Sequence, residues 1–508
     1  MVVKSPIIIK LSKRCRCCAD SLISKPLLLS VDLLATTGDI SFSWTSPIYP
    51  KLYSNDSTIN PLGRPITPDE DTWLGSLLNF GAIIGSPFFG YISAAFGRKP
   101  ALLCIALPHV ISYVTMAFAR NINLFLLARF VSGIAVGGGY TMLATYIGEI
   151  AEDSSRGGMS LTLNVFWAIG NFIPYAIGPF LSVFMFNSIL ALIPIVFLVI
   201  FTLFCPETPY YLVGVKKFRE AEKALMLLRS ADADAVEEEL TRIKIYMKSN
   251  EDGHFLDIVK SATLRKCFMI CFVLIATQEL SGFSVITYHL QSIFAATDSA
   301  VQPHISALIV GFVMLVSSFI APFLVDRSGR RNLVIWSCIG TCLSLTTLGT
   351  FFYIQDVLKA EPIFWIPIVS LISYIVSFNL GICTVPWTLT AELFPSNVKQ
   401  VAASSISICS WMVSFVTTNT FNDMTETLGR SGTFWCFAIL SFCSTIFAFV
   451  FVPETKGKSF MEIQEKLLPG VRETVDDKNS ELLVKGGQNG GGIFENGTDV
   501  EKLSSSII

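Results

Sequence analysis

The sequence contains few charged residues. Asp, Glu, Lys and Arg make up 15% of the 508 residues, whereas a soluble domain has about 25%. The formal net charge is only −2, and no broad basic face suggests a nucleic acid as a partner. Hydrophobic residues reach 52% and include 40 phenylalanines. This balance excludes an ordinary soluble domain and indicates an integral membrane protein.

The usual signatures of enzymes and metal sites are also missing. The chain has only 4 histidines, and we find no His-rich metal set, no nucleophile elbow and no phosphate-binding loop. We therefore expect no enzymatic activity, no cofactor and no metal. Most of the 13 cysteines lie in apolar runs, where a free thiol packs as a small hydrophobic group, so no disulfide framework is expected. Cys15, Cys17 and Cys18 stand among basic residues, where palmitoylation and plain reduced thiols are both consistent with the sequence.

Twelve apolar segments have about the 20 residues that a helix needs to cross a bilayer. They predict an all-α membrane protein with twelve transmembrane helices. We expect an N-terminal arm (1–26), two six-helix halves (27–204 and 265–452) and a mostly disordered tail (453–508). Between the halves, 205–264 carries helical charge patterns that predict short amphipathic surface helices. The expected spans are 27–49, 73–96, 101–117, 124–148, 159–182, 188–204, 267–294, 305–325, 333–353, 363–389, 401–421 and 433–452.

The distribution of basic residues predicts the orientation. With twelve spans, most lysines and arginines of the connecting loops fall on one side, which the positive-inside rule assigns to the cytoplasm together with both termini. We expect a multi-pass protein of the plasma membrane. Asn55-Asp56-Ser57 is then a glycosylation sequon outside the cell, whereas the sequon at Asn496 lies in the cytoplasmic tail and should be unused.

The two halves carry matching motifs in the same order. Each motif follows the corresponding span of its half, as in an internal repeat. Two six-span halves of this kind are typical of alternating-access transporters, whose substrate site lies between the halves. The pairs are Gly97-Arg98-Lys99 with 326–331, Glu149 and Arg156 with Glu392 and Lys399, and Pro206-Glu207-Thr208 with Pro453-Glu454-Thr455.

The seventh span contains an unusually polar stretch from Gln278 to His289. In a helix, its polar groups gather on one face, and hydrocarbon cannot satisfy them. A polar span interrupted by a glycine, here Gly282, is typical of a substrate site near the membrane midplane. The alternative is helix–helix packing by small and polar residues. The face consists of Gln278, Ser281, Gly282, Val285, Tyr288 and His289.

Three ionisable residues lie inside predicted spans and are candidates for binding a coupling proton. Asp39 in the first span is costly in hydrocarbon unless it is neutral, paired or hydrated. It can carry a proton, pair with a base, or lie in an aqueous outer mouth. Glu279 and His289 are the other two candidates.

In combination, these motifs resemble the sugar porter family of the major facilitator superfamily, over about residues 27–459. Within that family, 44–47 and 73–76 are most similar to insect facilitated trehalose transporters. The chain departs from the family pattern at Glu279, where a second glutamine is usual, and at Ser284, where an asparagine is usual. The motifs are the Gly-Arg-Lys loop and its partner 326–331, Glu149 to Arg156-Gly157, Pro206 to Leu212, Gln278 to Tyr288, and Pro386-Trp387 with Glu392 to Pro395.

The resemblance implies alternating-access transport of a sugar, either a hexose or a disaccharide such as trehalose, by a facilitative monomer in the lipid bilayer. The alternatives are a proton-coupled symporter and a carrier-like nutrient sensor that transports little. A neutral sugar requires amides and hydroxyls for hydrogen bonds and aromatic rings against its C–H faces. The implied substrate-binding residues are Gln278, Glu279, Ser284, Tyr288, Asn164, Trp387, Trp411 and Asn379. The implied gating residues are Arg98, Glu149, Arg156, Asp326, Arg330, Glu392 and Lys399.

Overall fold

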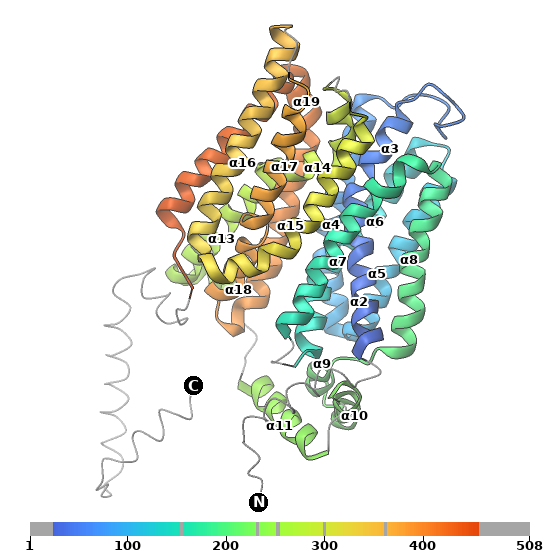
Figure 1. Ribbon diagram of the computed structural model, residues 1–508. Helices are drawn as coiled ribbons and strands as arrows, with labels where there is room; N and C mark the ends of the chain where they lie inside the picture. The colour runs from blue at the N-terminus through green and yellow to red at the C-terminus, as the bar shows by residue number, and fades with distance from the viewer. Residues whose placement is uncertain are drawn as a thin grey trace, which may run out of the picture. The chain divides into compact units, whose positions relative to one another are not determined.

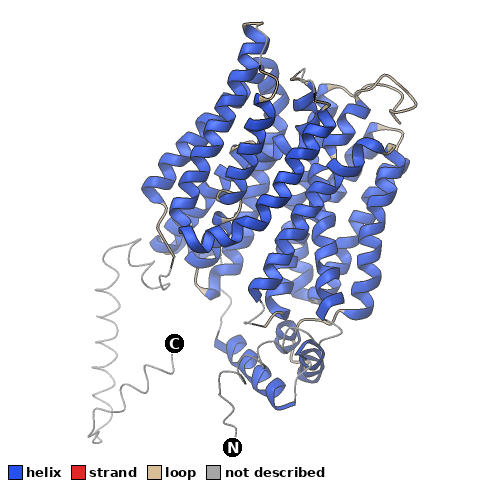
Figure 2. Ribbon diagram, viewed as in Figure 1, coloured by secondary structure: helices blue, strands red, loops and turns tan. Residues whose placement is uncertain are grey.

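The computed structural model describes residues 24–152, 156–229, 233–249, 255–297, 301–359 and 363–456. Every regular element in these ranges is a helix (Figure 2). The all-α prediction is therefore confirmed. Cys15, Cys17, Cys18 and Asn496 lie outside the described residues.

The N-terminal half consists of six spans, of which the first is interrupted. Its two helices meet at Trp44, because Pro47 lacks the N–H that would bond the carbonyl of Ser43. The spans are α2 (Ser24–Ser43) with α3 (Thr45–Leu52), α4 (Pro68–Phe96), α5 (Arg98–Phe118), α6 (Ile122–Ile150), α7 (Arg156–Ile177) with the 3₁₀ turn η1 (Gly178–Phe180), and α8 (Val183–Phe204).

The C-terminal half has six further spans, two of which are broken (Figure 1). Gly282 breaks the seventh span with a φ of 84°, a left-handed conformation that favours glycine. A Cβ at this position would also lie 2.9 Å from the ring of Phe437. The spans are α13 (Ala262–Leu280) with α14 (Phe283–Ala295), α15 (Pro303–Ser328), α16 (Arg330–Phe352) with η2 (Tyr353–Val357), α17 (Ile366–Leu380) with α18 (Val385–Leu393), and α19 (Ser396–Phe451), which joins two spans at Gly429.

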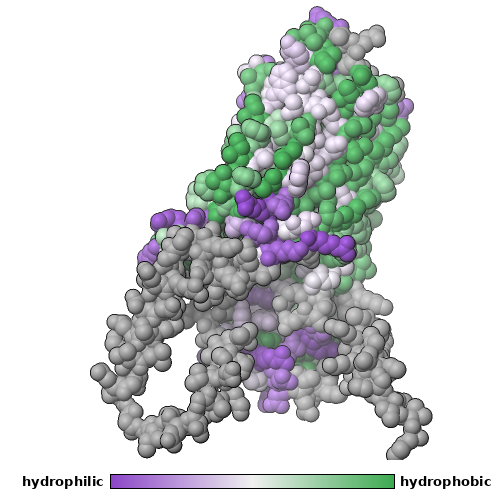
Figure 3. All heavy atoms as spheres, turned by 60° about the vertical axis from the view of Figure 1, so that its left-hand side comes forward, coloured by the Kyte–Doolittle hydropathy of each residue, from purple (hydrophilic) through white to green (hydrophobic). Residues whose placement is uncertain are grey.

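The surface and length of these helices suit a bilayer. Ten described helices are long and apolar enough to cross one, and α19 contains two of the expected spans. Large hydrophobic side chains such as Tyr91, Leu203 and Trp336 are more than two-thirds exposed. Figure 3 shows hydrophobic side chains over the sides of the bundle and hydrophilic ones towards its ends. Lipid is the solvent that makes such an exposed apolar surface favourable.

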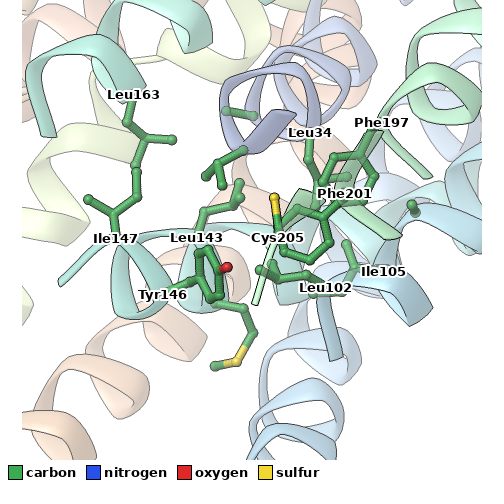
Figure 4. Packing of buried hydrophobic residues seen from close by; sticks show 14 of the residues in the cluster. Leu34, Leu102, Ile105, Leu143, Tyr146, Ile147, Leu163, Phe197, Phe201 and Cys205 are labelled. Atoms are coloured by element: carbon green, nitrogen blue, oxygen red, sulfur yellow. The ribbon is translucent and has the colours of Figure 1, made fainter. Parts of the chain in front are cut away.

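Helices within the N-terminal half approach closely. A Cβ on Gly85 of α4 would collide with the carbonyl of Ile134 on α6, so glycine permits this contact. A buried core lies along the C-terminal part of α6, where Tyr146 packs on Phe201 of α8 at 5.4 Å between ring centroids (Figure 4). Leu34 of α2 and Leu102 of α5 belong to the same core, to which α4 and α7 also contribute, so it ties six helices together.

Four short helices connect the halves: α9 (Pro209–Gly214), α10 (Phe218–Arg229), α11 (Ala233–Ser249) and α12 (Phe255–Lys260). The amphipathic pattern of 205–264 predicted such helices. It did not predict that α9, α10 and α11 pack on each other around a small core that includes Leu225 and Leu240. We call the end of the bundle with these helices the lower end and the end with the loop 53–67 the upper end, as in Figure 1.

Candidate functional site

Aromatic side chains from both halves meet at the centre of the bundle. Phe42 of α2 lies 5.7 Å from Trp411 of α19 and 5.9 Å from Tyr288 of α14, between ring centroids. Tyr140 of α6 stands edge-on to Trp411 at 5.6 Å and stacks on Trp167 of α7 at 5.0 Å. These five rings form the central aromatic cluster. Rings of this kind can cover the C–H faces of a sugar.

Asp39 lies beside this cluster on the side of the N-terminal half. Its carboxylate accepts hydrogen bonds of 2.5 Å from the phenol of Tyr140 and from Nδ2 of Asn171. The side chain is only 4% exposed. Both partners are neutral, so the described contacts of Asp39 do not pair it with a base. A side chain as buried as this one also does not lie in a hydrated outer mouth.

Glu279 lies on the side of the C-terminal half and is bonded by serines. Ser284 donates to its carboxylate at 2.9 Å and Ser410 at 3.2 Å. Ser284 also lies 2.9 Å from the hydroxyl of Ser414. The helix break at Gly282 makes this possible, because it turns α14 so that Ser284 faces Glu279 across one turn of chain. Ser284 and Glu279 are therefore engaged with each other in this structure.

Among the described residues, three buried polar atoms on α7, α13 and α19 have no hydrogen-bond partner. They are Oε1 of Gln278, Nε1 of Trp411 and Oδ1 of Asn171. Native proteins rarely leave such groups unpaired, since each costs the free energy of its lost hydration. Two of the atoms require a donor and one requires an acceptor. A ligand with several hydroxyl groups can supply both.

The other predicted binding residues lie in different surroundings. Asn164 is exposed on the stripe of α7 that also carries Trp167 and Asn171, nearer the lower end. Trp387 on α18 is 36% exposed. Asn379 is buried and donates to Ser317 at 2.7 Å, so it joins α17 to α15.

His289, a candidate for protonation, lies towards the upper end of α14. Its ring stacks on Tyr49 at 4.8 Å and is tilted against Phe421 at 5.0 Å. The single helical face expected for this span is therefore split by the break at Gly282. Gln278 lies on α13, whereas Tyr288 and His289 lie on α14.

Hydrogen bonds join the two halves from the cluster to the upper end. Tyr288 donates to Asn79 of α4 at 3.0 Å, and Asn79 donates to Thr418 of α19 at 3.1 Å. Further pairs are Thr45 with the carbonyl of Tyr288, Ser46 with Gln291, Ser76 with Asn419, Asn422 with Thr72 and the carbonyl of Pro68, and Tyr175 with the carbonyl of Thr287. These contacts close the halves against each other at the upper end.

The charged residues at the lower end pair within each half. In the N-terminal half Arg98 binds Glu149 at 2.8 Å, and Thr208 donates to the same carboxylate at 2.6 Å. In the C-terminal half Arg330 binds Glu392 at 3.0 Å, and Thr455 donates to it at 2.5 Å. The sequence repeat is thus a repeat of contacts. Each of these two pairs fastens helices of one half to each other.

The other gating candidates from the sequence are Lys399, Arg156 and Asp326. Lys399 is exposed in the first turn of α19. The side chains of Arg156 and Asp326 lie outside the described residues.

The glutamates of the two Pro-Glu-Thr motifs bind helix N-termini. Glu207 accepts from the backbone N–H groups of Arg98 at 3.0 Å and Lys99 at 3.1 Å, where α5 begins. Glu454 accepts from those of Arg330 and Arg331 at 3.0 and 3.2 Å, where α16 begins. A carboxylate is favourable at such a terminus. The sequence shows these motifs as a repeat but does not reveal this role.

The pKa values of the two glutamates shift in opposite directions. Burial raises the pKa of Glu207 above its usual value, and the backbone hydrogen bonds only partly offset this. Burial acts in the same direction on Glu454, but hydrogen bonds from Lys456, Arg330 and Arg331 outweigh it and lower its pKa.

Arg129 is a further residue that sequence analysis missed. It is fully buried in α6 and donates to the carbonyls of Leu74 at 3.0 Å and Ser41 at 2.5 Å. Its guanidinium lies 5.5 Å from the ring of Trp44 and 5.8 Å from that of Tyr288. A charged residue inside an apolar span was the available signal, since such residues are costly unless they are engaged.

Comparisons with known proteins agree on one family. The family profile described as "Sugar (and other) transporter" matches residues 53–467. Facilitated trehalose transporter Tret1 of Apis mellifera ligustica is 32% identical over 450 residues, which are 88% of this chain and 88% of that protein. Tret1 of Polypedilum vanderplanki is 32% identical over 82% of this chain and 83% of its own length. Tret1 of Anopheles gambiae is also 32% identical, but the chain spans only 56% of it.

Among solved structures, the chain is similar to the xylose transporter XylE from E. coli in its inward-open conformation. The TM-score is 0.69 at 23% identity, over 86% of this chain and 99% of that one. The partially occluded inward-open form of the same transporter gives a TM-score of 0.68. At this identity the likeness shows the fold, which agrees with twelve helices in two halves.

Proposed function

The chain belongs to the sugar transporter family, and we propose that it carries a sugar across the membrane by alternating access, with the substrate bound at the central aromatic cluster. The curated relatives are named facilitated trehalose transporters. A facilitative carrier of trehalose or of a hexose is therefore the function that we propose for this chain.

The observation that carries the proposal is the set of unpaired atoms at the cluster. Gln278 and Trp411 come from different helices of the C-terminal half, and each presents a buried polar atom without a partner. Trp411 also offers a ring, stacked on Phe42 at 5.7 Å. Aromatic faces combined with unsatisfied donors and acceptors are what a neutral polyhydroxy ligand requires.

A second candidate function is proton-coupled sugar symport. Asp39 favours it, because this buried carboxylate has only neutral partners in the described contacts. An ionised carboxylate at this depth is costly, so a proton that binds and leaves during the cycle would relieve that cost.

We further propose that the protein lies in the plasma membrane with the lower end in the cytoplasm. The excess of basic residues in the lower loops supports this orientation. Asn55 is exposed in the loop 53–67 at the upper end, as an extracellular sequon should be. We expect one chain to suffice, because the central site is assembled from helices of both halves of a single chain.

The test is uptake by purified protein in liposomes. A panel of radiolabelled sugars, including trehalose and glucose, is offered with and without a pH gradient, with protein-free liposomes as the control. Uptake that does not respond to the gradient supports the facilitative carrier, and uptake driven by the gradient supports the symporter. Binding without uptake would indicate a nutrient sensor, and neither binding nor uptake of any sugar would contradict the proposed function.

A further inference from the structure

The short helix α12 (Phe255–Lys260) ends where a membrane span begins. Only Ser261 separates it from α13, and the span that starts at Ala262 is long and apolar enough to cross a bilayer. Ser261 caps α13 by accepting a hydrogen bond from the backbone N–H of Leu264 at 3.4 Å. The depth of α12 is therefore set at the level where α13 enters the hydrocarbon.

Side-chain contacts fix α12 against the C-terminal half. The helix packs on α13 and α19, and its Ile258 is buried. The ring of Phe255 stands edge-on to that of Phe268 on α13, with 5.9 Å between the centroids. Arg265, at the start of α13, donates to the carbonyl of Val259 at 3.1 Å. The sides of α12 thus have defined directions relative to the membrane span.

The side of α12 that faces away from the protein is apolar. Phe255, Leu256 and Val259 are 44%, 62% and 46% exposed, and their spacing places them on one side of the helix, whereas Ile258 lies on another. Met269, further along α13, is exposed as well. In water such a surface is unfavourable, but at the boundary of a bilayer it lies against the acyl chains.

Basic side chains accompany this apolar side. The charged residues between 255 and 266 are Asp257 and the three exposed bases Lys260, Arg265 and Lys266. Anionic lipids attract bases that lie next to a membrane span. An apolar face bordered by lysine and arginine is typical of a helix that lies in the plane of the membrane surface. The nearby α11 lacks this balance, because it contains four acidic and three basic residues.

We propose that α12 and the start of α13 form an interfacial anchor that binds anionic phospholipids. The three apolar side chains lie among the ends of the acyl chains next to the headgroups, and the three basic ones lie at the lipid phosphates. This inference goes beyond the transport function and does not depend on which sugar is carried. The anchor would attach to the membrane surface the helix that carries Gln278 at its other end.

The depth of α12 can be measured in liposomes that contain the full-length protein. An environment-sensitive fluorescent amino acid is placed at Leu256, and lipids with brominated acyl chains serve as quenchers. Ile245 of α11 is the matched control position, because it is also 62% exposed and belongs to the same connection between the halves. Quenching at Leu256 should be at least about twofold stronger than at Ile245. Equal quenching at both positions would overturn the anchor.

Energy transfer from the same probe tests the preference for anionic headgroups. The acceptors are phosphatidylglycerol and phosphatidylcholine, each labelled in the acyl chain. At low ionic strength, transfer to phosphatidylglycerol should be at least about twofold larger, and the difference should shrink in high salt. The triple variant Lys260→Gln, Arg265→Gln and Lys266→Gln should abolish this preference.

A second triple variant controls for the loss of positive charge. Lys217→Gln, Arg219→Gln and Lys223→Gln removes three exposed bases in and beside α10 and should leave the preference unchanged. Equal transfer to both lipids in the wild type, or the same loss in both triple variants, would contradict the anionic-lipid site. Sugar uptake by the same liposomes tests the proposed function separately, so that either conclusion can fail without the other.

Discussion

The phenol of Tyr288 donates a hydrogen bond of 3.0 Å to Oδ1 of Asn79 and so joins the two halves of the transporter. Tyr288 lies on α14, directly above the break at Gly282, and Asn79 lies on α4. The same amide donates to Thr418. In alternating access the halves must part on one side at a time, so this contact should form in one state and break in the other.

Tyr288→Phe removes that contact and keeps the ring in the aromatic cluster. A neutral hydrogen bond contributes about 0.5–1.5 kcal/mol, so the state open at the upper end should become about two- to tenfold more populated. Spin labels at Asn121 and Lys359, in the upper loops of the two halves, would report the change as a larger share of long distances. An unchanged distance distribution would show that Asn79 and Tyr288 do not control closure.

Arg98→Ala should slow transport more than it weakens sugar binding. Arg98 fastens α5 to the end of α6 through Glu149, far from the aromatic cluster. We expect turnover to fall at least about fivefold while affinity changes less than about twofold, and Glu149→Ala should behave alike. The control is Arg242→Ala, which breaks an exposed i,i+4 pair with Glu238 and should have little effect. Equal losses of binding and turnover would point to folding damage instead of a role in the transport cycle.

Gln278→Ala should reduce sugar uptake while surface expression stays near normal. Its Oε1 has no partner within the protein, so removing it should cost the protein little and the bound sugar about two- to tenfold in affinity. Ser284→Asn restores the residue that is usual in the family and should change which sugars are accepted, since Ser284 now donates to Glu279. Poor expression with unchanged affinity for every sugar would favour the helix-packing interpretation of this span.

Asn55 should be glycosylated and Asn496 should not. Asn55 is exposed in the loop 53–67, whereas Asn496 belongs to the tail predicted to be cytoplasmic. Asn55→Gln should increase the gel mobility of the protein from an expressing cell and abolish its sensitivity to glycosidase. If Asn55→Gln changes neither property, the predicted orientation loses its main support.

The two helix-terminal glutamates should affect stability with opposite signs as the pH changes. Glu207 has a raised pKa in the folded state, so its contribution to stability grows as the pH falls through that pKa and is lost as the pH rises. Glu454 has a lowered pKa, so its contribution is present above the unfolded value and is lost as the pH falls through the folded pKa.

Melting temperatures of the purified protein between about pH 7.5 and pH 4 would test this linkage. As the pH decreases, the melting temperature of the wild type should rise relative to that of Glu207→Gln. Over the same range, the melting temperature of the wild type should fall relative to that of Glu454→Gln. Parallel shifts for both variants would contradict the assignment.

Several features of this protein follow from the sequence by itself. The apolar spans predicted the helices, because only a helix satisfies its own backbone in hydrocarbon. The polar residues around Gly282 marked the seventh span as unusual, whereas the left-handed break at Gly282 appears only in the structure. The paired motifs predicted the repeat, and Arg98 with Glu149 and Arg330 with Glu392 proved to be equivalent contacts.

Tertiary structure decided which partners the polar side chains take. Asp39 meets Tyr140 and Asn171, more than 100 residues away, and Glu279 meets Ser410 at a similar separation. Spacing along one helix defines its faces, but it does not define which neighbouring helix a face meets. For this reason the sequence could not show that the amide of Asn379 bonds Ser317, nor that an oxygen of Asn171 is buried without a partner in the packed bundle.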